Sequence, residues 1–474
     1  MRTVFVSGNF NVLHPGHLRL LRFAKELGDR LIVAIASDAL AGSAVMVPES
    51  LRLEGLQSNL WVDDAFIYNE DISDVLLRIR PDIVVKGQEF EGKHNREKFA
   101  LDSYGGKLIF SSGDSFFSSQ YLIDKELNIA NKSIRELGEF SQRHRITTKN
   151  LKNIIKNFKS KKVLVVGDLI VDEYISCEAL GMSQEDPTLV VKPIEAIKFL
   201  GGSGIVAAHA RGLGADVMYI SIAGDDQAGA YASKKLEDFG VSSQIIIDET
   251  RPTTLKQRYR ASNKTLLRVS SLQQNPVSLT IQETLFNAIS KSLDEVNLVV
   301  FSDFNYGCLP QSLVERVIKA CSAKGIPMIA DSQASSQMGD IGRFKEMMLI
   351  TPTEREARLS ARNDVDGLVV LAQKLLDSSG AQHIFVKLNQ EGVLLCTRTS
   401  LEVESWHTDK IEALNLFPKD TAGAGDSMLI SAGLALISGA TIWEAGAIGS
   451  VAAAIQVGRI GNLPLSYSEL EKQL

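Results

Sequence analysis

A turn of small residues bracketed by two aspartates lies near the C-terminal end of the chain. It reads Asp420-Thr421-Ala422-Gly423-Ala424-Gly425-Asp426 and precedes an apolar stretch that predicts a helix from about Ser427. A glycine-rich turn at the N-terminus of a helix offers several backbone amides to one anion. Asp426, held beside that anion, can accept the proton of an attacking hydroxyl. The pattern predicts phosphoryl transfer to an alcohol with Asp426 as the catalytic base; a capped helix start packed through its glycines is the structural alternative.

A second candidate site lies between the first predicted strand and the first predicted helix. It reads Ser7-Gly8-Asn9-Phe10-Asn11-Val12-Leu13-His14-Pro15-Gly16-His17. In an open parallel sheet, ligands bind at the carboxyl ends of strands, which is where this segment falls. His14 and His17 sit at or near a helix N-terminus, where they can donate to the phosphates of a nucleotide and stabilise charge during transfer. The alternative is two histidines satisfied within a turn.

Apolar runs alternate with helical patterns along the chain and predict two α/β domains. The first series opens with Thr3-Val4-Phe5-Val6, and the second opens with the strand from Lys162 to Val166, which ends in Gly167-Asp168. Strands separated by helices predict βαβ units and parallel sheets. We expect an α/β domain over 1–127, a linker containing helices over 128–160, and a second α/β domain over 161–474. Alternation at 188–198 and 254–269 predicts a small β lid on the second domain.

The composition is that of an ordinary globular protein and excludes several classes of function. The 474 residues are 45% hydrophobic and 23% charged, and 51 basic and 57 acidic residues give a net charge of −6. This balance supplies no general field for nucleic acid or anionic lipid, so we expect neither as a partner. Serines, glycines and Glu444 interrupt the apolar stretch from Met428 to Gly458, which predicts two buried helices rather than a membrane span. Scattered cysteines and an N-terminus without a secretory leader pattern predict a reducing, cytoplasmic location.

The C-terminal turn matches the DTxGAGD signature of the ribokinase (PfkB) family of carbohydrate kinases, and the resemblance extends over roughly 161–474. It implies a ribokinase-like α/β domain with a small β lid that phosphorylates a sugar with ATP and Mg²⁺. The positions that correspond to sugar-binding residues are Asp168, Asp172, Gly201, Gly202 and Asp303. Those that correspond to nucleotide- and metal-side residues are Thr351, Glu354, Glu356, Lys387 and Gly392, with Glu356 near the metal. Judged from the residues alone, Glu354 and Glu356 are equally well charges at a helix start.

The N-terminal segment resembles the HxGH signature of the nucleotidyltransferase superfamily. Further matches over roughly the first 125 residues are Gly28 to Ala34, Ser37-Asp38, Arg52 and Arg80 to Gly87. The resemblance implies a Rossmann-like, cytidylyltransferase-like domain with His14 and His17 as catalytic residues. It also implies a nucleotide, ATP or CTP, bound by Gly8, Asn9, Phe10, Lys86, Ser118 and Ser119.

Both segments depart from the patterns of the families that they resemble. Asn11 stands where the first family has an aspartate, and 39–47 contains no lysine where that family carries one. A cation on transferring phosphates contributes several kcal/mol, so slow or lost nucleotidyl transfer stays open. In the second domain, Ile205, Thr353 and Lys387 replace two asparagines and a threonine. These changes leave the catalytic aspartate intact, together with the small-residue turn from Asp420 to Gly425, which we call the anion turn. They favour an altered sugar preference.

The pair of domains resembles the bifunctional ADP-heptose synthases, although that family places its kinase first. The resemblance implies phosphorylation of a sugar or sugar phosphate, with C1 of heptose 7-phosphate as the leading candidate. Transfer of a nucleotide to the resulting sugar 1-phosphate would follow and serve surface polysaccharide synthesis. It also implies a homodimer and a monovalent cation. Two alternatives stay open: a sugar kinase with a degenerate nucleotide-binding N-terminal domain, and a non-enzymatic ligand sensor or scaffold, against which the intact Asp426 argues.

Overall fold

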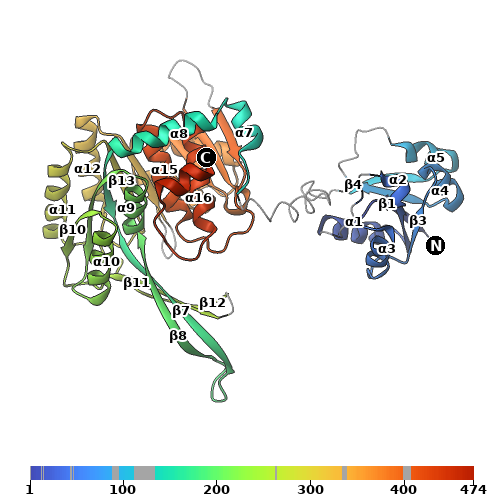
Figure 1. Cartoon of the computed structure of the whole chain (residues 1–474), viewed down its shortest axis with the longest axis horizontal. Helices are drawn as coiled ribbons and strands as arrows, with labels where there is room; N and C mark the ends of the chain where they lie inside the picture. Colours follow the sequence, from blue (N-terminus) through green and yellow to red (C-terminus); the bar gives the residue numbers. More distant parts are fainter. Residues whose placement is uncertain are drawn as a thin grey trace. The chain divides into compact units, whose positions relative to one another are not determined.

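The chain forms two compact units, Met1–Lys132 and Ser133–Leu474. The computed structural model describes residues 2–11, 13, 15–42, 45, 47–87, 95–111, 134–261, 264–333, 339–398 and 407–474. Both units are α/β folds, as predicted (Figure 1). Within these residues, no helix combines the length and the apolar character needed to cross a membrane.

The first unit is a parallel sheet with helices on both faces. Its described strands are β1 (Thr3–Gly8), β2 (Arg30–Ala36), β3 (Asp64–Tyr68), β4 (Ile83–Gly87) and β5 (Lys107–Ser111), in the order β3-β2-β1-β4-β5. Its described helices are α1 (Pro15–Glu26), α2 (Asp38–Ala41), α3 (Glu49–Gln57), α4 (Ile72–Ile79) and α5 (Arg96–Tyr104). Leu21 of α1 and Leu56 of α3 are buried in one core, whereas Leu76 of α4 and Leu101 of α5 are buried in the other. The carboxyl ends of the strands therefore meet at one edge, where the histidine-containing segment begins.

The second unit is built on a larger sheet, whose strand order in the described part of the chain is β10-β9-β6-β13-β14-β15-β16-β17-β18. Pairing is parallel from β10 to β16 and antiparallel at β17 and β18. The strands are β6 (Lys162–Gly167), β9 (Asp216–Ala223), β10 (Ser242–Ile247), β13 (Leu298–Asp303), β14 (Met328–Ser332), β15 (Leu349–Ile350), β16 (His383–Lys387), β17 (Val393–Thr397) and β18 (His407–Ile411).

Helices cover both faces of this sheet (Figure 1). One core contains residues of α9 (Ser203–Gly212), α10 (Gln227–Asp238), α15 (Ala424–Ile437), α16 (Ile442–Val457) and α17 (Tyr467–Gln473). The core on the other face contains residues of α11 (Leu279–Ser292), α12 (Gln311–Lys324), α13 (Glu354–Ala361) and α14 (Leu368–Ser379).

Helices α15 and α16 confirm the two buried helices that the sequence predicts over 428–458. They are apolar on all sides, as a helix enclosed by neighbours must be. A Cβ atom at Gly433 would overlap Ile329 of β14, and one at Gly446 would overlap Leu395 of β17. The close approach at Gly433 holds α15 against the sheet and thereby positions the residues of its first turn, and the one at Gly446 holds α16 in the same way.

A second, smaller sheet confirms the predicted lid. Its strands are β7 (Leu169–Met182), β8 (Leu189–Gly202), β11 (Thr254–Ala261) and β12 (Lys264–Ser271), in the described order β12-β11-β7-β8. The lid projects from the body of the second unit as a long twisted ribbon (Figure 1). Because β7 starts two residues after β6 ends, the lid is rooted at the carboxyl edge of the main sheet.

Residues 134–160, which we assigned to a linker, pack as part of the second unit. Helices α7 (Gly138–Arg143) and α8 (Thr148–Lys156) and the 3₁₀ turn Asn157–Ser160 follow one another there. Phe140, Leu151, Ile155 and Phe158 are buried in the same core as α15 and α16. The sparse apolar residues of this segment recur with helical spacing, so they form one stripe that can be buried although the composition is polar.

Candidate active site

Asp426 lies in the first turn of helix α15. Gly423 is the N-cap of this helix and has a φ of 77°. Its side chain is buried, with 5% of the residue exposed. Gln333 Nε2 donates to Asp426 Oδ1 across 3.4 Å. Burial, reinforced by the carboxylate of Asp331 and opposed by Lys387, raises the pKa of Asp426 to about 7. A carboxylate with a near-neutral pKa can take up and release a proton in the working range of an enzyme.

The small residues of the turn are required by close contacts. A Cβ atom at Gly423 would overlap Asn462 Oδ1, and one at Gly425 would lie 3.0 Å from Lys387 Nζ. Asp420 holds the start of the turn, since its Oδ1 accepts from the amide of Ala422 at 3.1 Å. The backbone amides at the start of α15 thus lie close to an ammonium group, a combination that suits an anion.

Lys387 forms a buried ion pair at the end of β16. Its Nζ lies 3.0 Å from both carboxylate oxygens of Asp331, and Thr351 Oγ1 donates to the same carboxylate at 3.1 Å. Burial disfavours the charged ammonium, but Asp331 more than compensates, so the pKa of Lys387 is raised. Lys387, predicted here on the nucleotide side, therefore stays charged next to the turn. The sequence analysis did not single out Asp331 as a site residue, although its position at the end of a predicted strand could have indicated one.

Asp172 stands on the lid strand β7, where glycine makes room for its carboxylate. A Cβ atom at Gly201 would overlap Asp172 Oδ2, because Gly201 is close to this residue on the neighbouring strand β8. The carboxylate oxygens lie 3.3 Å from Arg258 Nη2 and 3.3 Å from Asn462 Nδ2. Gly202 has a φ of 57° and ends β8 where a side chain would overlap the backbone of Asp168. Asp172 thus contacts Asn462, which also borders Gly423 of the turn, and its predicted contact with the sugar stays a prediction.

Asp168 and Asp303, predicted on the sugar side, are both hydrogen-bonded within the protein. The carboxylate of Asp168 accepts from the backbone amides of Phe304, Tyr306 and Cys308 at 2.7, 3.2 and 3.1 Å. Asp303 accepts from Ser332 Oγ at 2.7 Å and pairs with Arg343 Nη2 at 2.8 Å. Both residues are about 1–2% exposed. These contacts order the turn after β13, and the sugar contacts of Asp168 and Asp303 stay predictions.

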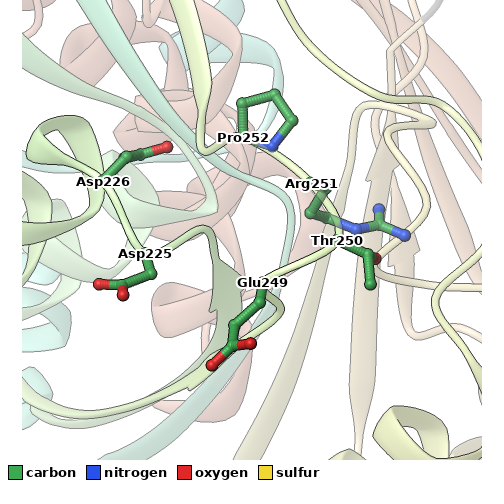
Figure 2. Close-up of a pocket in the computed structure, with 6 residues that line it drawn as sticks. All are labelled: Asp225, Asp226, Glu249, Thr250, Arg251 and Pro252. Carbon is green, nitrogen blue, oxygen red and sulfur yellow. The ribbon is translucent and has the colours of Figure 1, made fainter.

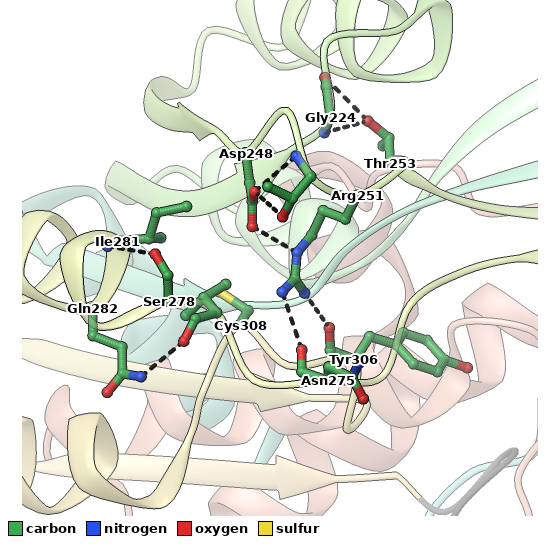
Figure 3. A network of polar contacts seen from close by, with 12 residues as sticks. Gly224, Asp248, Arg251, Thr253, Asn275, Ser278, Ile281, Gln282, Tyr306 and Cys308 are labelled. Atoms are coloured by element: carbon green, nitrogen blue, oxygen red, sulfur yellow. Dashed lines mark hydrogen bonds and ion pairs between the residues drawn. The ribbon is translucent and has the colours of Figure 1, made fainter.

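Arg251 also supports the turn after β13 (Figure 3). Its Nε donates to Asp248 at 2.8 Å, while Nη1 and Nη2 donate to the carbonyls of Tyr306 and Asn275 at 3.1 and 3.0 Å. The loops that carry Arg251 also line a cavity of about 560 Å³, formed by Asp225, Asp226, Glu249, Thr250, Arg251 and Pro252 (Figure 2). Sequence reasoning singled out none of these residues.

The predicted metal-side glutamates lie at the start of α13. Glu354 pairs with Arg358 at 2.7 Å, which matches the alternative of a helix-start charge. Glu356 is buried and forms a capping box, in which its Oε2 accepts from the amide of Thr353 at 2.7 Å. Among the residues that the structure describes, no three His, Cys, Asp or Glu side chains gather as a metal site. Gly392, with a φ of 95°, lets the β16–β17 turn approach the chain after β18, since a Cβ there would overlap Ile411 O.

In the first unit, Phe10 and His17 lie together at the carboxyl end of β1. Phe10 is buried with a φ of 49°, a conformation that side chains other than glycine rarely adopt. Its ring centre is 4.9 Å from that of His17 on α1. Gly8 packs against the same ring, because a Cβ there would lie 3.1 Å from Phe10. The predicted catalytic residue His14 and the predicted nucleotide-binding residues Ser118 and Ser119 lie outside the described residues.

Arg52 joins the loops of this site. It is 2% exposed, and it donates to the carbonyls of Asn9, Ala36 and Val47 at 2.7, 2.9 and 2.9 Å. Its Nη2 also lies 2.6 Å from Asp38 Oδ1. Lys86, at the end of β4, pairs with the buried Glu97 of α5 at 2.7 Å. The resemblance noted Arg52 without giving it a role, and nothing in the local sequence pointed to Glu97.

The sequence profile described as "pfkB family carbohydrate kinase" matches residues 160–466, more than half of the chain. The chain belongs to the pfkB family of carbohydrate kinases. A second profile, described as "Cytidylyltransferase-like", matches residues 5–104. The predicted combination of an N-terminal cytidylyltransferase-like domain with a C-terminal kinase domain is therefore confirmed.

Curated relatives of this pfkB-family chain carry the name "Bifunctional protein HldE". The protein from Desulfatibacillum aliphaticivorans is 31% identical over 321 residues, which make up 67% of this chain and 64% of the relative. The protein from Helicobacter hepaticus is 30% identical over 318 residues, 66% of this chain and 63% of the relative. The matched part of the chain thus spans less than two thirds of these relatives.

Solved structures match the fold of the kinase unit. Phosphofructokinase-2 from Escherichia coli in complex with potassium has a TM-score of 0.54 at 17% identity, covering 66% of this chain and 97% of that chain. Ribokinase from Thermotoga maritima has a TM-score of 0.51 at 19% identity, covering 66% and 99%. At these identities the likeness confirms a ribokinase-like fold and nothing more.

Proposed function

We propose that the chain is a bifunctional sugar-activating enzyme, in which the second unit phosphorylates a sugar hydroxyl from ATP and the first unit transfers a nucleotide to the product. The observation that carries the proposal is Asp426, a buried carboxyl with a pKa of about 7 beside a glycine turn at a helix N-terminus. Family membership supports the kinase half, and the Cytidylyltransferase-like match supports the other half.

In the kinase reaction, Asp426 accepts the proton of the acceptor hydroxyl as its oxygen attacks the γ-phosphorus and ADP leaves. The amides at the start of α15 donate to the phosphoryl oxygens during transfer, and Lys387 adds a positive charge next to them. Because the site is buried, these donors act in a low dielectric, which strengthens their effect on charge that develops in the transition state.

The residues around Lys387 fit the Mg²⁺ that such kinases use. Mg²⁺ is usually bound by one or two carboxylates together with substrate phosphates. Asp331 and Glu356 supply carboxylates close enough for Glu356 to add to the rise that burial causes in the pKa of Asp331. When bound, the ion neutralises charge on the phosphates. No ligands are assigned to the predicted monovalent cation.

The leading acceptor is a heptose 7-phosphate, phosphorylated at C1, which the name of the HldE relatives and the resemblance to ADP-heptose synthases favour. A reversed domain order also accounts for the partial coverage of those relatives, since a collinear alignment can match only one domain of a swapped pair. The product of the first unit would be an ADP- or CDP-linked sugar for the synthesis of surface polysaccharide. A cytoplasmic location, where ATP is abundant, belongs to the same proposal.

A second candidate is a sugar kinase whose first unit binds nucleotide without turning it over. Asn11 and the lack of a lysine over 39–47 favour it, because both departures fall where the transferase chemistry takes place.

We further propose a homodimer formed through the lid. Large apolar side chains are exposed on its strands, namely Leu189, Val190, Ile194, Ile197, Leu266, Leu267 and Val269. Sedimentation velocity tests this: a dimer that the double substitution Ile194→Lys and Ile197→Lys converts to a monomer supports it, and a monomeric wild type refutes it.

The two activities are separated by measuring ADP and pyrophosphate release from the whole chain with phosphorylated heptoses and ATP or CTP. We expect Asp426→Asn to abolish ADP release, and His17→Ala to remove pyrophosphate release alone. Wild-type protein that releases ADP but never pyrophosphate would favour the second candidate. Retained kinase turnover in Asp426→Asn would refute the assignment of the base.

A further inference from the structure

A hydrogen bond joins the lid to the first residue of the anion turn. Tyr174 lies on the lid strand β7, and its Oη donates to Asp420 Oδ2 at 2.7 Å. Tyr174 is 6% exposed, so water has little access to its side of this bond. Burial, opposed by Arg258 and reinforced by Asp420, raises the pKa of Tyr174. The hydroxyl therefore keeps its proton at neutral pH and acts as a donor.

The carboxylate of Asp420 connects three parts of the kinase unit. Besides the bond from Tyr174, its Oδ2 accepts from the backbone amide of Gly461 at 3.1 Å, and its Oδ1 accepts from the amide of Ala422 at 3.1 Å. Gly461 follows α16, and Ala422 lies within the anion turn. Hydrogen bonds to a carboxylate are among the stronger ones in proteins. The lid, the loop after α16 and the anion turn are thus held together at one side chain.

The lid meets the loop after α16 at two further points. The ring of Phe199, on β8, packs on Gly461, where a Cβ atom would lie 2.4 Å from its Cζ. The φ of Gly461 is 77°, a value in the left-handed region that favours glycine. Asn462 Nδ2 lies 3.3 Å from Asp172 Oδ2 on β7. The loop is therefore packed closely against the lid, which restricts the positions open to Asp420.

Phosphoryl transfer depends on the placement of the anion turn. The turn leads into the N-cap of α15 at Gly423, and Asp426 follows in the first turn of that helix. The amides that donate to the phosphoryl group and the proposed base are therefore carried by one short segment. Such donors act in a transition state because their orientation is fixed beforehand. A displacement of about 1 Å can lower a rate by about 10²-fold. A contact that orients the start of the turn is thus able to control the rate without touching a substrate.

We propose that Tyr174 is a positioning residue of the kinase unit. Its hydroxyl holds the carboxylate of Asp420, and Asp420 in turn holds the anion turn in the arrangement that phosphoryl transfer requires. Tyr174 acts through Asp420 and needs no contact with phosphate or acceptor for this role. The inference rests on the proposed function, because it concerns the reaction of the same site.

The test starts from Tyr174→Phe, which removes the hydroxyl and keeps the ring, whose centre is 5.2 Å from that of Phe199. We expect kcat of the full chain for phosphoryl transfer to fall about tenfold or more, as the loss of one hydrogen bond to a charged group does. KM for ATP and for the acceptor should change by less than about twofold, because an interaction that matters only in the transition state lowers kcat and kcat/KM equally. An unchanged kcat would overturn the inference.

The matched control is Tyr231→Phe. Tyr231 lies on α10, and its Oη donates to the backbone carbonyl of Lys198 on β8. This hydroxyl thus binds the lid as that of Tyr174 does, but its acceptor is a lid carbonyl rather than the anion turn. We expect kcat of Tyr231→Phe to stay close to that of wild type. Equal losses in the two variants would show that any loosening of the lid slows transfer, and would overturn the inference.

A second substitution shows whether Tyr174 acts through Asp420. In Asp420→Ala the hydroxyl has lost its acceptor, so adding Tyr174→Phe should lower kcat no further. A further loss of about tenfold in the double variant would contradict the proposed route. If Asp420→Ala does not fold, Asp420→Asn replaces it, since it keeps the size of the side chain and weakens the same bond. In that protein Tyr174→Phe should lower kcat by less than it does in wild type, and an undiminished loss would count against the route.

Hydrogen exchange separates failure of the inference from failure of the proposed function, because it needs no substrate. In Tyr174→Phe the backbone amides of 420–426 should exchange about tenfold faster than in wild type, and in Tyr231→Phe at the wild-type rate. If the wild type transfers no phosphate to any acceptor, the proposed function fails and this measurement decides the inference. Equal exchange of these amides in wild type and Tyr174→Phe refutes it.

Discussion

The two units present their candidate sites at the same place in a parallel sheet but hold them in different ways. In the kinase unit, Asp426 lies on a helix clamped by glycine contacts and is surrounded by charged groups from other strands. In the first unit, one buried side chain, Arg52, links the chain segments around Asn9, Ala36 and Val47. The kinase site is therefore supported by many contacts, whereas the described part of the first site depends heavily on a single residue.

Of the substitutions that distinguish the two units, removal of the Lys387 side chain should have the largest effect, and it should lower kinase activity. Lys387→Ala removes the cation beside the anion turn and leaves Asp331 buried without its partner. We expect kcat for phosphoryl transfer to fall by about 10²–10³-fold, the range found when one donor to a transition-state oxyanion is deleted. The pH midpoint of the remaining activity should rise, because Lys387 opposes the rise of the pKa of Asp426.

The control is Lys410→Ala, since Lys410 forms an exposed pair with Glu391 at 2.9 Å. Kinase activity close to that of wild type is expected for it. A Lys387→Ala protein with unchanged kcat would show that the anion turn works without this cation.

Arg52→Ala should be the next largest change, and it should act on the first unit alone. Loss of the guanidinium leaves the carbonyls of Asn9, Ala36 and Val47 without a donor, which should cost about 2–4 kcal/mol of unfolding free energy. Chemical denaturation, monitored by hydrogen exchange in each unit, measures this loss of stability. Kinase turnover should be unaffected. The matched control is Arg22→Ala, which breaks the exposed pair with Glu26. Equal destabilisation by both substitutions would contradict the role given to Arg52.

The smallest effect is a dependence of stability on pH that distinguishes the buried acid of the kinase unit. The pKa of Asp426 is about 7 in the folded chain against an ordinary 3.8. As the pH rises, the unfolded chain ionises this group first, so its contribution to stability is lost from about pH 4 to pH 7. The change in unfolding free energy that Asp426→Asn causes should therefore be more favourable at pH 8 than at pH 5, by on the order of 2 kcal/mol. Equal stability differences at the two pH values would contradict the raised pKa.

The sequence predicts those parts of the site that lie on one continuous segment. The turn from Asp420 to Asp426 and the lid could be located from local patterns, whereas Lys387 and Asp172 were singled out by the resemblance to the kinase family. Asn462 could not, because it meets Asp172 across 290 residues of chain and no local pattern marks it. Asp168 shows a second limit, since spacing places a carboxylate in a turn but does not reveal that backbone amides use its oxygens.

The same limit explains residues 134–160, where a polar composition suggested a linker. Burial of Phe140 and Leu151 depends on a matching surface formed by α15 and α16, which lie far away in the sequence. Arg52 differs again, since its importance comes from the carbonyls that surround it rather than from its neighbours along the chain.

The central claim is that Asp426 accepts the proton of the acceptor hydroxyl, and the pH dependence of single-turnover phosphoryl transfer tests it most directly. Wild-type protein should show a rate that rises with pH through a midpoint of about 7, set by deprotonation of this carboxyl. Asp426→Asn should lower the rate by about 10²–10⁴-fold and abolish that limb of the profile. An Asp426→Asn protein that keeps the limb, or transfers phosphate at the wild-type rate, would contradict the account.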